Sequence, residues 1–415
     1  MIRQEIEEQL IEQLVNRIEE TNTKILSKIG KTIKTISTLS PSQAYQISNI
    51  LKYGGSYEKI VKEIARVSGK NVQDIYKIFE EVAKSNKQFA KDFYEYRKID
   101  YIPYNKDSAL KQQVESIAKL TAGTYRNIAN TSMIGLVENG KFTQLQKAYE
   151  DIIDKAILSI AQGKENFYSS MRDTLKEIGG NGLVVYESGR KRKLDSVVRM
   201  NIQDGLRQLN NETNKRFGDE YGANMIEVSH HQNSAPDHID SVDGKQFARI
   251  DVIKQQIANG TEKEIKLSDI EADRVKVKGK WYKDFDSVNN NLERQVSTLN
   301  CRHYIFNGIL GISKPLYTKE QLEKDKSKNI KGFEYEGKHY TMYEGEQLQR
   351  KLELEIRKQK DTQILAKSSG DMELVEESQT KITQLTHKYN NLCKTSGLKP
   401  KKQRMSVINY RRVKV

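Results

Sequence analysis

The chain has 415 residues, with 70 Lys and Arg against 56 Asp and Glu and a formal net charge of +14. Hydrophobic residues make up 36% and charged residues 30%, and no apolar run approaches the roughly 18 residues of a membrane helix, so an integral membrane protein is excluded. The first twenty residues carry six glutamates and no apolar block, which excludes a secretory signal peptide and predicts a protein that stays inside the cell that makes it.

Cysteine and proline are both scarce. The two cysteines, Cys301 and Cys393, are expected to remain reduced thiols, because two thiols cannot supply a disulfide framework. Five prolines in 415 residues are few, and since proline breaks helices this scarcity favours long uninterrupted ones.

The N-terminal half has helical periodicity. Apolar residues from Ile2 to Ile18 recur every four positions with charged residues on the other face, which predicts an amphipathic helix that ends near Ser40-Pro41. Gly179-Gly180-Asn181-Gly182 is interpreted as a helix-breaking cluster. Between these points, further helices are predicted over residues 42–52, 56–67, 71–96, 106–135, 142–162 and 165–178.

Short mixed elements are predicted after residue 182. Asp195 is expected to cap a helix over 196–217. Asp243-Gly244-Lys245 predicts a two-residue hairpin turn, because Asp-Gly accommodates positive backbone angles, and Trp281 is expected in the core of this module. Strands are predicted over 183–186, 225–229, 245–249 and 275–282, with an exposed hairpin tip at 188–193.

Helical patterns return near the C-terminal end, over about 319–329, 342–363 and 371–393, and the residues after Leu398 are expected to pack on no core. We therefore predict a mainly α fold. Its parts are an elongated helical N-terminal body (1–180), a small α+β module (181–315), a helical basic C-terminal segment (316–397) and a basic tail (398–415).

Histidines concentrate in the α+β module. Imidazole and thiolate are ligands that zinc prefers, so four side chains are candidate metal ligands: His231, His238, Cys301 and His303. Their spacing lacks the CxxC, HExxH and paired-ligand patterns of common zinc sites. The alternative is that these side chains cap strands and hydrogen-bond within a loop-rich module. We expect no cofactor, with zinc as the alternative.

A second interpretation of the module is an acid–base or nuclease site. No Walker A loop, GxGxxG, GxSxG or kinase signature is present, so ATP-driven and serine-hydrolase functions are not expected. We expect a protein that is not an enzyme, with a metal-dependent nuclease or toxin-like enzyme as the alternative. That enzyme would use His231 or His238 as base, Asp237 or Asp240 as orienting carboxylate, and Arg249 or Arg302 as phosphate ligand.

Half of the excess positive charge lies in the tail, which carries seven basic residues and no acidic one, whereas the first 398 residues carry 63 basic and 56 acidic residues. A flexible basic arm attracts polyanions through counterion release, although such a tail can also serve solubility alone. A cytosolic nucleic-acid-binding protein is a further alternative. The candidate nucleic-acid contacts are Lys399, Lys401, Lys402, Arg404, Arg411, Arg412 and Lys414, with Arg190 and Arg192 of the hairpin tip.

A series of short motifs follows in order over about 186–358. The motifs are Tyr186–Gly189, Leu194–Asn201, Ile226–Ser229, Ala235–His238, Asp243–Lys245, Asn300–His303, Gly311–Pro315, Tyr340–Glu344 and Gln349-Arg350. In order and spacing this series resembles the tailed-phage family called phage minor capsid protein 2. One position departs from the family pattern: Ala235 stands before Pro236, where the family commonly has Arg, so an arginine-dependent phosphate site is not expected there.

The resemblance implies a structural role similar to that of the Mu F-like head morphogenesis proteins. Such proteins lie in few copies at or near the portal vertex inside the head, after assembly in the host cytoplasm. The implied partners are the portal protein, the major capsid protein or scaffold, and packaged viral DNA, with no membrane required. In this reading the structural motif residues tie the loops of the module together; they are Arg199, Pro236, His238, Gly244, Cys301, Arg302 and His303.

Overall fold

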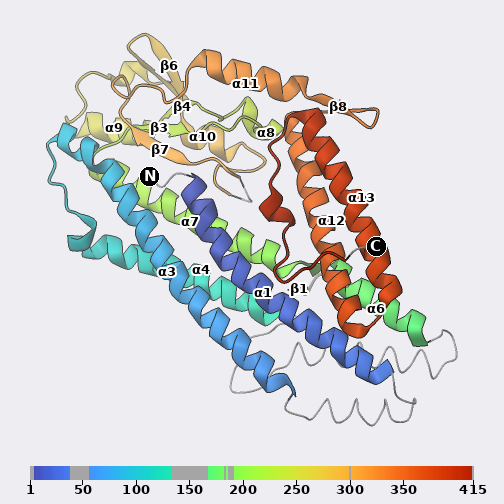
Figure 1. Cartoon of the computed structure of the whole chain (residues 1–415). Coiled ribbons are helices and arrows are strands. Elements are labelled where there is room, and N and C mark those ends of the chain that lie inside the picture. The colour runs from blue at the N-terminus through green and yellow to red at the C-terminus, as the bar shows by residue number, and fades with distance from the viewer. Residues whose placement is uncertain are drawn as a thin grey trace. The chain divides into compact units, whose positions relative to one another are not determined.

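The computed structural model describes residues 4–37, 56–131, 167–181, 184–185, 191–298 and 301–413 (Figure 1). Contacts divide the chain into two compact units, each built from separate stretches of sequence. Unit 1 comprises Met1–Glu7, Ile75–Thr121 and Ile202–Gly345, and unit 2 comprises Glu8–Asp74, Ala122–Asn201 and Glu346–Val415. Helices far apart in the sequence are thus grouped in one unit. The domain boundaries at residues 181, 316 and 398 stay a prediction.

The described residues are mainly helical with small sheets, which confirms the mainly α fold class. None of the helices in these residues is long and apolar enough to cross a membrane. The helices are α1 (Gln4–Ser37), α3 (Ser56–Arg97), α4 (Ser108–Thr131), α6 (Phe167–Asn181), α7 (Leu194–Glu220), α8 (Pro236–Ile239), α9 (Ile250–Ala258), α10 (Phe285–Asn290), α11 (Lys319–Lys331), α12 (Met342–Ser369) and α13 (Met372–Ser396), with 3-10 turns η1 (Tyr104–Lys106), η2 (Leu267–Asp269) and η3 (Lys402–Met405).

In the part of the chain that the structure describes, four small antiparallel sheets accompany the helices. The largest has the order β4-β3-β7, and its central strand pairs Met225 with Ala248 on one side and with Gly308 on the other. The other three sheets are the hairpins β1-β2, β5-β6 and β8-β9. The strands are β1 (Val184–Val185), β2 (Lys191–Arg192), β3 (Met225–Val228), β4 (Gln246–Ala248), β5 (Arg274–Val277), β6 (Lys280–Lys283), β7 (Ile305–Gly308), β8 (Phe333–Tyr335) and β9 (Lys338–Tyr340).

Both faces of the three-stranded sheet are covered in unit 1. Alternate side chains of a strand point to opposite faces, and every residue of β3 is buried. Met225 packs in a cluster with residues of β5 and α9, whereas Ile226 and Val228 pack with Phe247 and Phe285. The central strand is therefore fixed on both sides, and it carries the loop that follows it into the interior.

Three predictions of local structure were wrong. The separate helices predicted over 56–67 and 71–96 are one helix, since α3 runs unbroken through Ser68-Gly69. Gly179 and Gly180 do not break the helix but lie inside α6. A β-carbon at Gly179 would lie 2.2 Å from Thr362 of α12, so glycine at this position permits the two helices to pack closely. The strand over 275–282 is the hairpin β5-β6, turned by Lys278 and Gly279, both with positive φ.

Trp281 is a further correction. It was expected in the core of the module but is 42% exposed, and its ring lies 4.6 Å from the guanidinium carbon of Arg274. On the two-stranded hairpin Val275 and Tyr282 face inward, so Trp281 falls on the outer face, where the arginine covers it.

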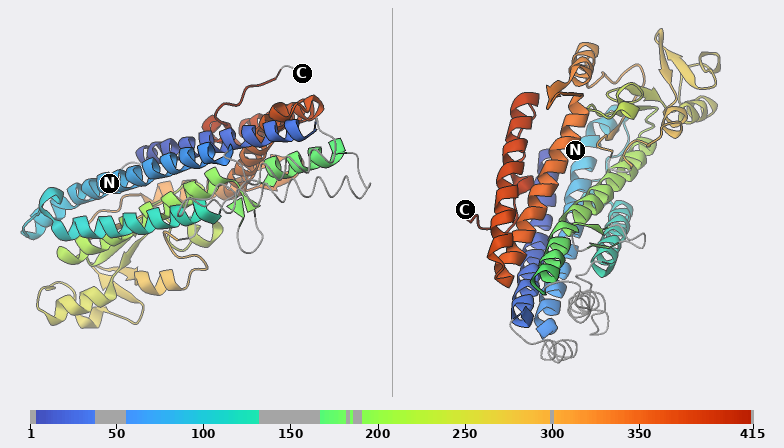
Figure 2. Two further views of the ribbon diagram at one scale, coloured as in Figure 1. Left: turned by 90° about the horizontal axis from the view of Figure 1, so that it is seen from below. Right: turned by 90° about the vertical axis from the view of Figure 1, so that its right-hand side faces the viewer.

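The basic tail after Leu398 packs in unit 2, contrary to the prediction that it packs on no core. Figure 2 shows α12 and α13 side by side, joined through Gly370 with φ +83°, and Asp371 caps α13 by accepting from the Leu374 amide at 3.0 Å. Leu398 and Val407 are each 7% exposed. Side chains of the two helices bond the backbone of the segment, as described below.

Some sequence predictions fall outside the described residues. Among these are the helix end near Ser40-Pro41, the helices over 42–52 and 142–162, Gly182, the motif Tyr186–Gly189, and the candidate contacts Arg190 and Lys414.

Candidate functional site

A buried cluster in unit 1 gathers the histidines and the cysteine that the sequence singled out. The loop of residues 229–245, between β3 and β4, supplies His230, His231 and His238, the last from α8. The segment before β7 supplies Cys301 and His303. The sheet β4-β3-β7 fixes both segments, because they flank paired strands.

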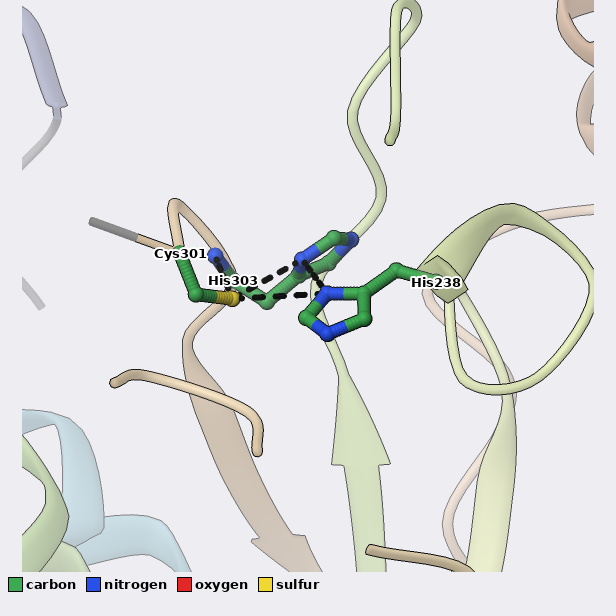
Figure 3. Close-up of side chains that lie close together, drawn as sticks. All are labelled: His238, Cys301 and His303. Atoms are coloured by element: carbon green, nitrogen blue, oxygen red, sulfur yellow. Dashed lines mark hydrogen bonds between the residues drawn. The ribbon is translucent and has the colours of Figure 1, made fainter. Parts of the chain in front are cut away.

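Three ligand-type atoms converge at the centre of the cluster (Figure 3). His238 Nδ1 lies 3.1 Å from His303 Nδ1, and Cys301 Sγ lies 3.3 Å from His303 Nδ1 and 3.5 Å from His238 Nδ1. The three side chains are 0–3% exposed. Among the described residues these are side chains that could hold a metal ion, with their ligand atoms all within 4.8 Å of one another.

Asp243 organises the histidines around this centre. Its Oδ1 accepts from Ser234 Oγ at 2.6 Å, from His303 Nε2 at 2.8 Å and from the His231 amide at 2.9 Å, and its Oδ2 lies 2.6 Å from His230 Nδ1. The predicted hairpin turn at Asp243-Gly244-Lys245 was wrong, since the connection from β3 to β4 is a long loop containing α8. The Asp243 carboxylate is the shared hydrogen-bond acceptor, here called the polar hub, of that loop.

The other nitrogens of the inner histidines are also bonded. His238 Nε2 lies 2.6 Å from the Arg294 carbonyl oxygen, and His231 Nε2 lies 2.6 Å from the Arg302 carbonyl oxygen. A carbonyl oxygen accepts hydrogen bonds and cannot donate them, so both Nε2 atoms carry protons. These bonds tie the loop of residues 229–245 to the segment that leads into β7.

The cluster shifts the titration of its members. Burial would raise the pKa of the Cys301 thiol, but the contacts of Sγ with the Nδ1 atoms of His238 and His303 lower it to about 5. Burial, helped by nearby His303, lowers the pKa of His231 to about 4. Burial alone would raise the pKa of Asp243, yet hydrogen bonds from His230, His303 and Ser234 lower it. The centre therefore favours a thiolate and a carboxylate.

His230 joins the cluster to α11. Its Nε2 lies 3.0 Å from Asp325 Oδ2, and the bond to Asp243, opposed by burial, raises the pKa of His230. Asn329, also on α11, donates to the Ser234 carbonyl at 3.0 Å and accepts from the Tyr343 amide at 3.0 Å. α11 is therefore fixed to the loop by buried polar bonds.

The residues of the predicted acid–base site have other partners. Asp240 lies 2.6 Å from Lys326, and Arg249 lies 2.8 Å from Asp219. Asp237 lies 3.0 Å from Arg294 and 3.5 Å from His238 Nε2, which bonds the Arg294 carbonyl instead. The described geometry does not assemble this set around one reacting position.

The remaining motif residues have structural positions. Pro236 is the first residue of α8, and Gly244 has φ +66°, with Leu322 2.4 Å from where a β-carbon would lie. Arg302 supplies the carbonyl that His231 bonds. Arg199 belongs to unit 2, where it lies 2.8 Å from Glu12 of α1, so it does not join the histidine cluster.

The candidate nucleic-acid contacts from Lys399 to Arg412 lie on a backbone that α12 and α13 bond. Gln349 donates to the Lys399 carbonyl at 3.0 Å, Tyr389 Oη accepts from the Lys401 amide at 2.6 Å, and Arg357 donates to the Arg404 carbonyl at 3.1 Å. Four of the basic side chains are exposed: Lys399, Lys402, Arg411 and Arg412. Lys193, expected at an exposed hairpin tip, is 4% exposed and pairs with Asp361, while Arg192 lies in β2.

Sequence reasoning missed Asp243, Ser234 and Asp325 as members of the site. Asp243 lay inside one of the motifs of the resemblance, but its Asp-Gly pair has a ready interpretation as a turn. Ser234 and Asp325 carry no local signal, because only the fold brings α11 to the loop.

Comparisons with known proteins give one family. The family model of phage minor capsid protein 2 matches residues 4–394. No curated protein and no solved structure matches the chain. Because the family model spans nearly all of the chain, and the motifs around the histidine cluster lie within the match, this protein belongs to the phage minor capsid protein 2 family and is a bacteriophage minor capsid protein.

Proposed function

We propose that this minor capsid protein is a structural, non-enzymatic part of a tailed-phage head, bound at the portal vertex on the inner side of the capsid, where it contacts packaged DNA. The family match over residues 4–394 carries the proposal. The portal protein and the major capsid protein or scaffold are its partners during assembly in the host cytoplasm.

Long amphipathic helices support a role in assembly. α1, α3 and α12 are 34, 42 and 28 residues long. Apolar residues such as Leu14 of α1 are buried within the protein, but Phe89 and Tyr96 of α3 are 47% and 56% exposed, and a partner helix or groove would cover them. The described acid–base candidates have structural partners, which favours a structural protein over an enzyme.

The composition of purified particles tests the location. We expect the protein in mature heads at low copy number, with cross-links to the portal protein and protection from trypsin until the heads are opened. Its presence in infected-cell lysate but absence from purified heads would contradict the proposal. Trypsin cleavage in intact heads would contradict the internal position.

The DNA contact is assigned to the docked basic segment of residues 399–412. Contacts to phosphates release counterions, so the logarithm of affinity falls with the logarithm of salt concentration by about 0.9 per phosphate for duplex DNA. Replacing Lys399, Lys402, Arg411 and Arg412 by Gln should therefore weaken binding at low salt and reduce this slope by up to about 3.6.

A second fourfold variant is the matched control. Lys319, Lys324, Lys328 and Lys331 of α11 are also exposed, and their replacement by Gln removes the same charge. We expect this variant to retain most of the salt slope. An equal loss in both variants would show that net charge, and not the docked segment, governs binding.

A further inference from the structure

We propose that His238, Cys301 and His303 bind one zinc ion through Nδ1, Sγ and Nδ1. The site goes beyond the role in the head, since it concerns how the loop of residues 229–245 is held to the segment before β7. The argument rests on the distances, the hydrogen bonds behind each ligand and the charges around them (Figure 3).

The three distances match the edges of a zinc tetrahedron. With Zn–N of about 2.0–2.1 Å and Zn–S of about 2.3 Å, tetrahedral angles separate two nitrogens by about 3.4 Å and a nitrogen from sulfur by about 3.6 Å. The protein holds these pairs at 3.1 Å for nitrogen to nitrogen, and at 3.3 and 3.5 Å for nitrogen to sulfur. Each edge lies within about 0.3 Å of the ideal length, so binding requires little movement.

The bonds behind the rings aim lone pairs at this point. His238 Nε2 donates to the Arg294 carbonyl oxygen at 2.6 Å, and His303 Nε2 donates to Asp243 Oδ1 at 2.8 Å. A metal binds the neutral form of imidazole, and in that form a proton on Nε2 leaves the lone pair on Nδ1. Two Nδ1 lone pairs and one sulfur thus converge. A single proton can join only two of these three atoms, whereas one metal ion can bind all three.

The surroundings match the charge of the ion. A dication is balanced by the Cys301 thiolate and the Asp243 carboxylate, while a protonated His230 is balanced by Asp325 at 3.0 Å. Asp243 and the Arg294 carbonyl are the outer partners that orient ligating histidines in zinc sites. The S–Zn bond forms with the thiolate, and a chain whose Cys301 is still a thiol releases that proton to solvent on binding.

Three protein ligands leave one position of a tetrahedron for a water molecule. His231 is the nearest further histidine, with its ring centroid 4.8 Å from that of His303, but its Nε2 donates to the Arg302 carbonyl at 2.6 Å. His231 therefore stands beside the site as a hydrogen-bonded neighbour. This makes it the control for the ligand assignment.

The full-length chain, purified without added metal, is tested by elemental analysis. We expect about one zinc per chain and a Tm that falls when a chelator removes the metal and recovers when zinc alone is returned. Replacement with Co²⁺ should give a thiolate-to-cobalt charge-transfer band and intense visible bands of a tetrahedral site. A folded chain without metal, with Tm unchanged by zinc and no such bands with Co²⁺, would overturn the proposal.

Variants separate the ligands from their neighbours. Cys301→His retains a ligand, so it should still bind Co²⁺ with tetrahedral bands but lose the thiolate band, whereas Cys393→Ser should keep both because Cys393 lies in unit 2. His231→Gln should keep one zinc, and zinc loss in that variant would overturn the ligand set. His303→Gln should lower zinc affinity at least 10-fold, and an unchanged affinity would also overturn it.

Discussion

Glu19 of α1 lies among buried charges of unit 2 that neutralise one another without it. Lys193 pairs with Asp361, and Arg357 lies 3.2 Å from Asp195, so two cations already balance two carboxylates. All five side chains are buried. Burial, reinforced by nearby Asp195, raises the pKa of Glu19 from 4.5 to about 7. A neutral side chain at this position therefore suits the network better than a charged one.

Glu19→Gln should stabilise unit 2 at pH 8 by on the order of 2 kcal/mol and leave stability near pH 4 unchanged. Because the pKa of Glu19 is raised in the folded state, protonated Glu19 contributes to the free energy of unfolding fully below pH 4.5, and this contribution is lost as the pH rises through about 7. Urea unfolding at a series of pH values measures the difference. Glu20→Gln is the control, since Glu20 is half-exposed and pairs with Lys24 at 3.0 Å.

Asp243→Asn should destabilise unit 1 by about 3–5 kcal/mol, because it removes the buried carboxylate from hydrogen-bonded histidines. The pKa of Asp243 is lowered in the folded state, so its contribution is present at neutral pH and declines on acidification. Chemical denaturation at pH 7 measures the loss. Asp240→Asn nearby, at an exposed pair with Lys326, should change stability by less than about 1 kcal/mol, and equal effects would contradict the hub role of Asp243.

At the scale of elements, two adjacent glycines of helix α6 have different roles: Gly179 packs closely against α12, and Gly180 does not. A β-carbon at Gly179 would lie 2.7 Å from Thr362 Cα of α12, whereas nothing lies within 4 Å of one at Gly180. Both residues are helical, where alanine is intrinsically favoured over glycine by about 1 kcal/mol. Close packing therefore reverses the effect of alanine at one position only.

Gly179→Ala should destabilise by about 1–3 kcal/mol, because α6 and α12 must separate to admit the methyl group. Gly180→Ala should instead stabilise by about 0.5–1 kcal/mol. Thermal unfolding of the two single variants, compared with the parent chain, measures both signs. Stabilisation by Gly179→Ala would show that the helices do not approach at this residue.

The elements also show what sequence could predict. Long helices such as α7 and α13 were predicted within a few residues, since their periodicity is local. The glycines of α6 and the Asp-Gly pair at Asp243 were misread, because their roles depend on Thr362 and on histidines far along the chain. Likewise the sequence supplied His238, Cys301 and His303 as candidates but could not show that they converge.

At the scale of the whole molecule, unit 2 uses the segment after Leu398 as part of its structure. Polar side chains of α12 and α13 bond its backbone, with Gln349 at 3.0 Å from the Lys399 carbonyl and Gln379 at 3.1 Å from the Val413 amide. A truncated chain leaves these groups without their partners. The role of this segment in DNA binding and its role in stability must therefore be tested by different variants: substitutions of its basic side chains for the first and truncation for the second.

Truncation after Leu398 should lower the Tm of the protein, because it exposes the surface that covers Val407 and removes the bonds to Gln349 and Tyr389. The Gln variants of the four exposed basic side chains should leave Tm nearly unchanged, since those bonds involve the backbone. Differential scanning calorimetry distinguishes the two. An unaltered Tm after truncation would mean that the segment does not pack in solution.

Because the segment after Leu398 is part of unit 2, the two units complete their folding in a fixed order during synthesis on the ribosome. Residues 8–37 of α1 and the residues after Leu398 both belong to unit 2, yet some 360 residues of synthesis separate them, or roughly 20–70 s at about 5–20 residues per second. The last stretch of unit 1 ends at Gly345, so that unit completes before unit 2. A chain released early thus carries a finished unit 1 and an unfinished unit 2, with the polar groups of α12 still hydrated.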